Sequence, residues 1–267
     1  MNRTLPIACI LALGLLTPRA GADILYNGLI GLWTADGNAY DTSVTGNNGS
    51  FAGAYAAGIS GSAFNLSTGS VTVPDNAVYN FGSGDFSVGF WFNFNGASQN
   101  QVAFLGQDEG PNVVNKWFID YNLTHAGAFG FHTNGSILGY AASSTIALPS
   151  SGWSQFTLVK NGTTYSFFLD GTSVGSATGN ATIPDPNAPL TLGFAEGTLA
   201  YAGLMDNVVI YDRALTQSDV QTLAETPEPA AFWLFGSLVA GCAIFRRSGY
   251  RRAVAKASAS TEPTINR

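Results

Sequence analysis

The chain has 267 residues, a formal net charge of −6 and 10% charged side chains, against 46% hydrophobic ones. Between Asp23 and Glu225, twelve Asp and three Glu accompany only three basic residues, so this segment has a net charge of −12. A segment this acidic lacks the cations that bind nucleic acid phosphates, which excludes nucleic acid as a partner. The two cysteines, Cys9 and Cys242, lie outside it. It therefore cannot form a disulfide, and its stability must come from a large core.

The first 22 residues have the organisation of a signal peptide. Arg3 supplies a positive charge, residues 5–16 form an apolar stretch, and residues 20–22 (Ala-Gly-Ala) fit the small-residue pattern that precedes cleavage. We therefore expect a signal peptidase to remove residues 1–22, so that the mature, exported chain begins at Asp23.

The middle of the chain has the alternation of β-strands. Every second residue of Phe86–Phe94 is Phe or Val, and residues 153–159 repeat this period of two. Asp170 and Gly171 follow a third such run and predict a type I′ hairpin turn, because both turn residues need a positive φ. Many short strands with close turns indicate an all-β sandwich or jelly roll. The other predicted strands are Leu29–Trp33 and residues 63–66, 71–74, 102–105, 117–121, 129–131, 165–169, 190–194 and 208–211.

One short helix is predicted over residues 217–223. Thr216 can cap its first turn, and Asp219 stands at the third helical position, which is a variant of the capping box. Val220 and Leu223 form an apolar pair three residues apart. We expect this helix to pack on the edge of the sandwich.

The C-terminal region has three parts. Pro227, Glu228 and Pro229 come first, then an uncharged apolar run over residues 230–245, and then a basic cluster, which consists of Arg246, Arg247, Arg251 and Arg252. As a helix the run spans about 24 Å, somewhat less than the ~30 Å hydrocarbon core, so it predicts a marginal transmembrane helix. The arginines place its C-terminal end in the cytoplasm. The alternative is a buried core helix. The polar residues 253–267 are predicted to be disordered.

This order of motif, apolar helix and arginines resembles the PEP-CTERM sorting signal of Gram-negative bacteria that secrete exopolysaccharide. The resemblance implies export, transient anchoring in the inner membrane, and cleavage near Pro227, Glu228 and Pro229 by an exosortase. The protein would then reside at the cell surface or in the extracellular matrix. The 15 residues that follow the arginines depart from the family pattern, in which the signal ends soon after them.

Residues 23–225 resemble laminin-G-like, concanavalin A-like jelly-roll domains. The resemblance implies a jelly-roll sandwich but is a poor guide to activity, because this fold hosts sugar-binding, protein-binding and catalytic proteins. Seven segments carry it in the family's order: residues 31–49, 61–66, 71–74, 85–91, 153–159, 165–171 and 201–215.

The sequence favours a protein without catalytic activity. Glycan-cleaving jelly rolls use two carboxylates about 5–9 Å apart, and no strand here carries such a pair. Asp108 and Glu109 are flanked by Gly and Pro and predict a loop, and Asp120 is alone on its strand. His125 and His132 lack the spacing of a catalytic triad or a metal site, and we expect them to be ordinary rim residues.

A carbohydrate site needs an exposed aromatic platform. Trp91 and Trp153 match positions where the resembled family has structural tryptophans, and Trp33 has apolar neighbours, so we expect all three in the core. Trp117, in a less patterned region, is the candidate platform. We expect Tyr121, Asn122 and His125 to complete its rim.

Calcium is the one cofactor that the sequence suggests. Asp36, Asn38, Asp41 and Asn47 cluster in a glycine-rich loop, and oxygen ligands suit Ca²⁺. The resemblance implies a structural ion held by Asp41 and Asp206. Alternatively, these side chains only supply turn chemistry.

The predicted role is to bind or organise extracellular polysaccharide or matrix without catalysis. A glycan-cleaving hydrolase or lyase on the same fold, and a protein–protein adhesion module, stay open as alternatives. Exosortase and signal peptidase are the predicted processing partners.

Overall fold

The computed structural model describes residues 26–94, 99–125, 127–133, 136–138, 152–180 and 182–225. The predicted signal peptide (1–22), the sorting signal (226–252) and the C-terminal tail (253–267) lie outside these residues. Among the helices that are described, none has the length and the hydropathy needed to cross a bilayer.

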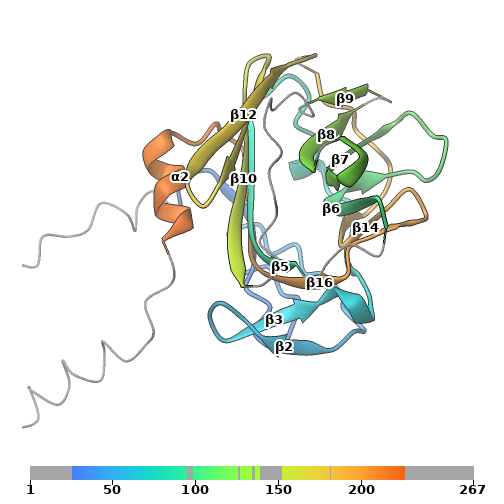
Figure 1. Ribbon diagram of the computed structural model, residues 1–267, viewed down its shortest axis with the longest axis vertical. Coiled ribbons are helices and arrows are strands. Elements are labelled where there is room, and N and C mark those ends of the chain that lie inside the picture. The colour runs from blue at the N-terminus through green and yellow to red at the C-terminus, as the bar shows by residue number, and fades with distance from the viewer. Residues whose placement is uncertain are drawn as a thin grey trace, which may run out of the picture. The chain divides into compact units, whose positions relative to one another are not determined.

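The described residues form two facing β-sheets (Figure 1). The larger sheet has eight strands in the order β12-β11-β10-β5-β16-β3-β2, with β1 paired to β16. Every pairing in it is antiparallel. Its strands are β1 (Leu29–Trp33), β2 (Tyr55–Ala57), β3 (Ser62–Asn65), β5 (Phe86–Phe94), β10 (Trp153–Asn161), β11 (Thr164–Leu169), β12 (Thr172–Thr178) and β16 (Gly203–Tyr211).

The smaller sheet has six strands in the order β4-β13-β6-β7-β8-β9, and its pairings are also antiparallel. A separate hairpin, β14 (Phe194–Ala195) and β15 (Leu199–Ala200), follows β13 in the chain. The six strands are β4 (Val71–Val73), β6 (Gln101–Asp108), β7 (Lys116–Asn122), β8 (Ala128–Thr133), β9 (Ser136–Leu138) and β13 (Leu190–Leu192). Three 3₁₀ turns lie at Leu66–Thr68 (η1), Ala77–Tyr79 (η2) and Leu123–His125 (η3).

The main core lies between the two sheets and is rich in aromatic side chains. Strand β5 shows why: Phe86, Phe90 and Phe92 are buried in this core, because alternate residues of a strand point to the same face. Phe90 and Phe92 contact Phe104 of the opposite sheet, with ring centroids 5.1 Å and 5.5 Å apart. Aromatic rings provide the large buried area that a domain without disulfides needs.

Each sheet has a different cover on its outer face (Figure 1). Helix α2 (Gln217–Ala224) packs on the larger sheet through a second apolar cluster, which consists of Leu29, Val159, Phe168, Val209, Tyr211, Leu215 and Val220. The β14–β15 hairpin packs on the smaller sheet through a third, small cluster, which consists of Ala103, Phe118 and Ala195, with Leu199 beside it.

Most predicted elements are confirmed. Leu29–Trp33 and Phe86–Phe94 are strands with the predicted bounds, and the predicted helix is one residue longer. The helix packs on the face of the larger sheet and not on its edge as predicted, because Val220 shares its apolar cluster with side chains of several strands. Asp170 and Gly171 have φ values of 49° and 73°, as the type I′ turn requires. The run over residues 190–194 is instead divided, because Gly193, with a φ of 86°, turns the chain between β13 and β14.

The tryptophan predictions are confirmed for two of three residues. Trp33 and Trp91 are buried, and the indole N–H of Trp33 donates to the carbonyl of Asn47 at 3.3 Å. Trp153 is only half-buried, because it is the first residue of β10, at the end of the strand.

Candidate functional site

The prediction that Trp117 is an exposed platform is wrong. Its side chain is completely buried in the main core, and its indole N–H donates to Oε1 of Gln107 at 3.1 Å. The amide of Gln107 in turn donates to Oδ1 of Asp75 and to the carbonyl of Ala188, both at 2.9 Å. Trp117 is therefore part of a satisfied buried network, which leaves it no surface on which a sugar could stack.

The predicted companions of Trp117 do not form a rim either. Tyr121 is buried in the same core, four residues after Trp117 on the same face of β7. Asn122 is buried, and its Oδ1 accepts hydrogen bonds from the backbone N–H and the hydroxyl of Thr124, at 2.9 Å and 2.6 Å. His125 ends η3, and its side chain lies outside the described residues.

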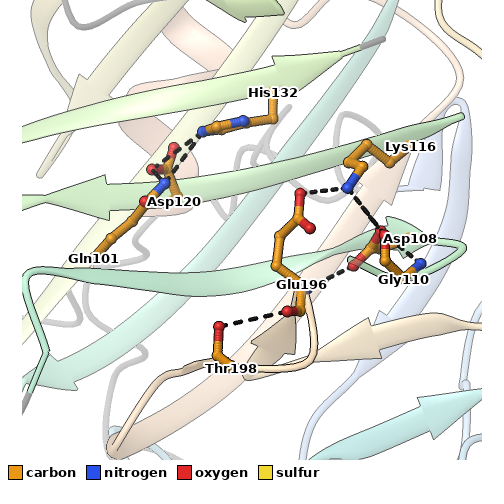
Figure 2. Close-up of polar contacts among 8 residues, drawn as sticks. All are labelled: Gln101, Asp108, Gly110, Lys116, Asp120, His132, Glu196 and Thr198. Atoms are coloured by element: carbon orange, nitrogen blue, oxygen red, sulfur yellow. Dashed lines mark hydrogen bonds and ion pairs between the residues drawn. The ribbon is translucent and has the colours of Figure 1, made fainter. Parts of the chain in front are cut away.

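The polar chemistry lies instead on the outer face of the six-stranded sheet. Every second residue of β7 from Trp117 to Tyr121 is in the core. Alternation then places the residues between them on the other face. The outward residues are Phe118 and Asp120, with Lys116 just before Trp117, and all three are buried by neighbouring elements. Figure 2 shows the two clusters of polar contacts that Lys116 and Asp120 form with those elements.

The first cluster, the His132 cluster, consists of Gln101, Asp120 and His132, from the adjacent strands β6, β7 and β8 (Figure 2). The amide of Gln101 donates to Oδ2 of Asp120 at 2.6 Å, and Nε2 of His132 lies 3.5 Å from the same oxygen. Asp120 is fully buried, whereas 13% of the His132 side chain is exposed. The three residues also take part in other interactions. His132 is therefore not the ordinary rim residue that the sequence predicted.

The imidazole of His132 has two further neighbours. Its ring stacks on Phe118, with centroids 4.3 Å apart and planes 11° from parallel. Its Nε2 lies 3.2 Å from the amide nitrogen of Gln101, and this contact is a hydrogen bond only when Nε2 carries no proton. The cluster thus combines a buried carboxylate and a buried aromatic ring with an amide and an imidazole that are partly exposed, and the two exposed groups are of the kind that recognise hydroxyls.

The second cluster, the Lys116 cluster, consists of Asp108, Lys116 and Glu196 (Figure 2). The ammonium of Lys116 makes an ion pair with Glu196, lies 3.4 Å from Oδ1 of Asp108, and donates to the carbonyl of Gly110 at 3.1 Å. Asp108 also accepts from the backbone N–H of Gly110 at 2.9 Å and of Glu196 at 2.5 Å. Asp108 was predicted to lie in a loop but is the last residue of β6.

The spacing of the carboxylates on this face bears on catalysis. Asp108 is the cross-strand partner of Lys116, and Asp120 is four residues further along β7, or about 13 Å at ~3.3 Å per residue. This exceeds the separation of a glycosidase pair. Asp108 and Glu196 are closer, but Lys116 bridges them and its ammonium occupies the space that a scissile bond would need.

The two predicted calcium ligands have different partners in the structure. Asp41 accepts four hydrogen bonds, two on each oxygen, from the backbone of Leu32, Ser43 and Asn47 and the hydroxyl of Thr45, at 2.8–2.9 Å. Burial raises the pKa of Asp41, but these hydrogen bonds outweigh burial, and its pKa is below the ordinary value. These four donors engage both oxygens of Asp41, which thereby organises its own loop.

Asp206 is fully buried and neighbours Asp36 rather than Asp41. Its Oδ2 accepts from the backbone N–H groups of Ile59 and Ser60, at 3.0 Å and 3.3 Å. Oδ1 of Asp36 accepts from Ser62, in the same turn, at 3.0 Å. Burial raises the pKa of Asp206 to about 6, and the charge of Asp36 adds to the increase. The described residues contain no group of three or more His, Cys, Asp or Glu side chains placed to hold a metal ion.

Comparison with known proteins identifies a family. The model of the family Laminin_G_3, described as the concanavalin A-like lectin/glucanases superfamily, matches residues 65–221. No curated protein matches the sequence significantly.

Several solved structures have a similar fold. Domain 4 of AbnA, a GH43 extracellular arabinanase from Geobacillus stearothermophilus solved with arabinotriose, is 19% identical, with a TM-score of 0.59 over 74% of this chain and 98% of that one. The binding domain of Paraclostridial Mosquitocidal Protein 1 is 19% identical, with a TM-score of 0.57 over 74% and 52%. A Trypanosoma rangeli sialidase solved with sialic acid is 17% identical, with a TM-score of 0.55 over 74% and 32%. The chain thus spans about half of the second protein and about a third of the third, and at these identities the likeness concerns the fold.

Proposed function

Because this chain belongs to the concanavalin A-like lectin/glucanases superfamily, we propose that its domain binds extracellular polysaccharide without cleaving it. The observation that carries the proposal is the His132 cluster. Three adjacent strands direct a carboxylate, an amide and an imidazole to one place on the outer face of the smaller sheet. The partly exposed amide of Gln101 and imidazole of His132 can donate to and accept from vicinal hydroxyls, while the buried Asp120 and Phe118 hold them in place. AbnA domain 4, with the same fold, was solved with a bound trisaccharide.

The absence of cleavage is part of the proposal. Glycoside hydrolysis by the usual route needs two carboxylates that can approach one glycosidic bond. On this face Asp120 is about 13 Å along the strand from Asp108, and the charges of Asp108 and Glu196 are engaged by Lys116. This arrangement favours a binding role over a hydrolase or lyase.

Binding and turnover are measured on the same samples. The protein is titrated with exopolysaccharide from its native host and with purified arabinan, and new reducing ends are counted after prolonged incubation. We expect saturable binding without new reducing ends. Asp120→Asn should weaken binding about tenfold, because the amide of Gln101 loses the charged hydrogen bond that orients it. Asp212→Asn, at an exposed carboxylate, is the matched control and should bind normally.

Other outcomes point to the alternatives. New reducing ends that disappear in Asp120→Asn would identify a hydrolase, and an unsaturated product would identify a lyase. No binding to any polysaccharide, together with binding to a cell-surface protein, would replace the proposal by an adhesion module.

We also propose, from the sequence, that the precursor is exported, anchored in the inner membrane and then released by an exosortase to the cell surface or matrix. The support is the order of Pro227-Glu228-Pro229, the apolar run and the arginines. The test is the intact mass of the protein recovered from its host. A chain that begins at Asp23 and ends near Pro229 is expected, whereas a chain that retains Arg246 would contradict sorting by cleavage.

A structural calcium ion is a separate proposal. The sequence assigned it to Asp41 and Asp206; we propose Asp36 as the partner of Asp206, because its charge acts on Asp206 and both carboxylates contact one turn. Both carboxylates hold the turn over residues 58–62. The melting temperature in EDTA and in millimolar calcium tests it. A rise with calcium that is lost in Asp36→Asn is expected, and equal melting temperatures would refute it.

A further inference from the structure

The β14–β15 hairpin is connected to the His132 cluster through a single aromatic ring. Ala195 and Leu199 of the hairpin pack with Ala103 and Phe118 on the outer face of the smaller sheet. On the same face, Phe118 stacks on the imidazole of His132 at 4.3 Å. The position of the hairpin therefore affects the packing of Phe118, and the packing of Phe118 affects the orientation of His132.

The hairpin is too small to hold this position by itself. Each of its strands has two residues, and isolated two-stranded hairpins are marginally stable at best. Its turn also requires Glu196 and Gly197 to adopt positive φ values of 54° and 67°. This is the conformation of a type I′ turn, which disfavours a residue such as Glu. An anchor outside the hairpin must offset this cost.

The Lys116 cluster is that anchor. Its ammonium pairs with the side chain of Glu196 at the tip of the hairpin, and Asp108 accepts from the backbone N–H of the same Glu196 at 2.5 Å. The side chains of Lys116 and Asp108 are 5% and 9% exposed, so solvent screens their charges weakly. Without the ammonium, two carboxylates would remain next to each other in a largely buried place and would repel the hairpin.

We propose that Lys116 is a positioning residue for the polysaccharide-binding face: it fixes the β14–β15 hairpin over Phe118 and thereby sets the orientation of His132. This inference rests on the proposed function, since it assigns the His132 cluster a ligand. Lys116 itself need not touch the polysaccharide, because its three hydrogen-bonding positions are used by Glu196, Asp108 and Gly110.

The test follows the imidazole directly by NMR, in the full-length protein labelled with ¹³C-histidine. The sequence has only two histidines, His125 and His132, so a His125→Gln variant assigns both signals. Stacking on Phe118 should shift the carbon-bound ring protons of His132 upfield. In Lys116→Met, which keeps the aliphatic stem and removes the charge, we expect loss of this upfield shift. The amide of Tyr201, which donates to the carbonyl of Gly193 at the base of the hairpin, should exchange about tenfold faster.

Two further variants keep the proposal falsifiable. Lys116→Arg, which restores the cation, should recover both signals. Glu196→Gln acts from the hairpin side, where 26% of the side chain is exposed, and should reproduce the effect even if Lys116→Met fails to fold. Unchanged His132 signals in Lys116→Met, or in Glu196→Gln where Lys116→Met does not fold, would overturn the inference.

The readout separates this inference from the proposed function. If the wild type binds polysaccharide, and Lys116→Met binds it equally well and has the same His132 signals as the wild type, the inference fails and the function stands. If the wild type binds no polysaccharide, the function fails, while the NMR signals still decide whether Lys116 positions His132.

Discussion

Helix α2 covers the outer face of the eight-stranded sheet through apolar side chains. The outer face of the six-stranded sheet instead carries buried charges and a small hairpin, residues 194–200. The apolar cover stabilises the sandwich without any need for specific partners. The buried charges cost desolvation energy and persist only where each is compensated, as Lys116 and Asp120 are. Buried polar groups that stability does not require are candidates for function, and this contrast directs attention to the smaller sheet.

The largest expected effect comes from placing a charge under the helix. Val220 is fully buried between α2 and the larger sheet. Val220→Asp would bury a carboxylate among apolar side chains, which provide no cation to compensate its charge. We expect a loss of about 4 kcal/mol of unfolding free energy. Urea unfolding measures this loss, with Val220→Ala as the apolar control, which removes two methyl groups and should cost about 1–2 kcal/mol. Polysaccharide binding per folded molecule should be unchanged, and a specific loss of binding would mean that this face also contacts the ligand.

The larger sheet also has buried charged residues, Lys160 and Asp206, and Asp206 predicts a pH dependence of stability. Its pKa of about 6 in the folded state is above the ordinary 3.8, so between about pH 4 and pH 6 the folded chain holds a proton that the unfolded chain has released. The unfolding free energy contributed by this group therefore falls as the pH rises through that window, by about 3 kcal/mol in total.

Asp206→Asn removes this titration. The variant loses stability at every pH, because an amide nitrogen cannot accept from all three N–H groups that contact the carboxylate, from Ile59, Ser60 and Asn207. The loss of unfolding free energy in Asp206→Asn, relative to the wild type, should nevertheless be smaller at pH 7.5 than at pH 4.5. Unfolding free energies of both proteins at these two values test the prediction, and parallel pH profiles would contradict it.

Trp117 sharpens the contrast between the two faces of a single strand. Trp117→Phe keeps the buried ring but removes the N–H that donates to Gln107. A buried acceptor without its donor costs about 1–3 kcal/mol, so we expect a destabilisation of about 2 kcal/mol with normal polysaccharide binding. The measurement is urea unfolding together with binding of the same sample. Lost binding with unchanged stability would restore Trp117 as a ligand platform.

The sequence predicted the fold well because its signals are local. The aromatic alternation of Phe86–Phe94, the Asp170-Gly171 turn and the capping residues of α2 each depend on neighbours a few positions away. The strands β2 and β15, by contrast, have three and two residues and too short a pattern to be recognised. Their pairing depends on partners that only the folded sheet provides.

The candidate site was harder to predict, for two separate reasons. One signal was present in the sequence. Lys116 and Asp120 are four residues apart and therefore lie on the same face of β7, which places Trp117 on the opposite face, toward the main core. The other signal is absent from the sequence. Gln101 and His132 meet at Asp120 through the registers of three strands, and register is set by the whole sheet rather than by local spacing.

The smallest effect is expected where α2 begins. Thr216 Oγ1 accepts from the N–H of Asp219 at 3.2 Å, and Oδ2 of Asp219 accepts from the N–H of Thr216 at 3.0 Å. Thr216→Ala removes half of this capping box and should cost about 1 kcal/mol, while Thr216→Ser keeps the hydroxyl and should cost less. Thermal unfolding of the two variants measures the difference. Because the helix covers only the apolar face, neither variant should change the NMR signals of His132, whereas Lys116→Met should. A shift of those signals in Thr216→Ala would mean that the two outer faces are coupled through the sandwich. It would contradict the view that the helix-covered face only stabilises the fold while the other face carries the candidate site.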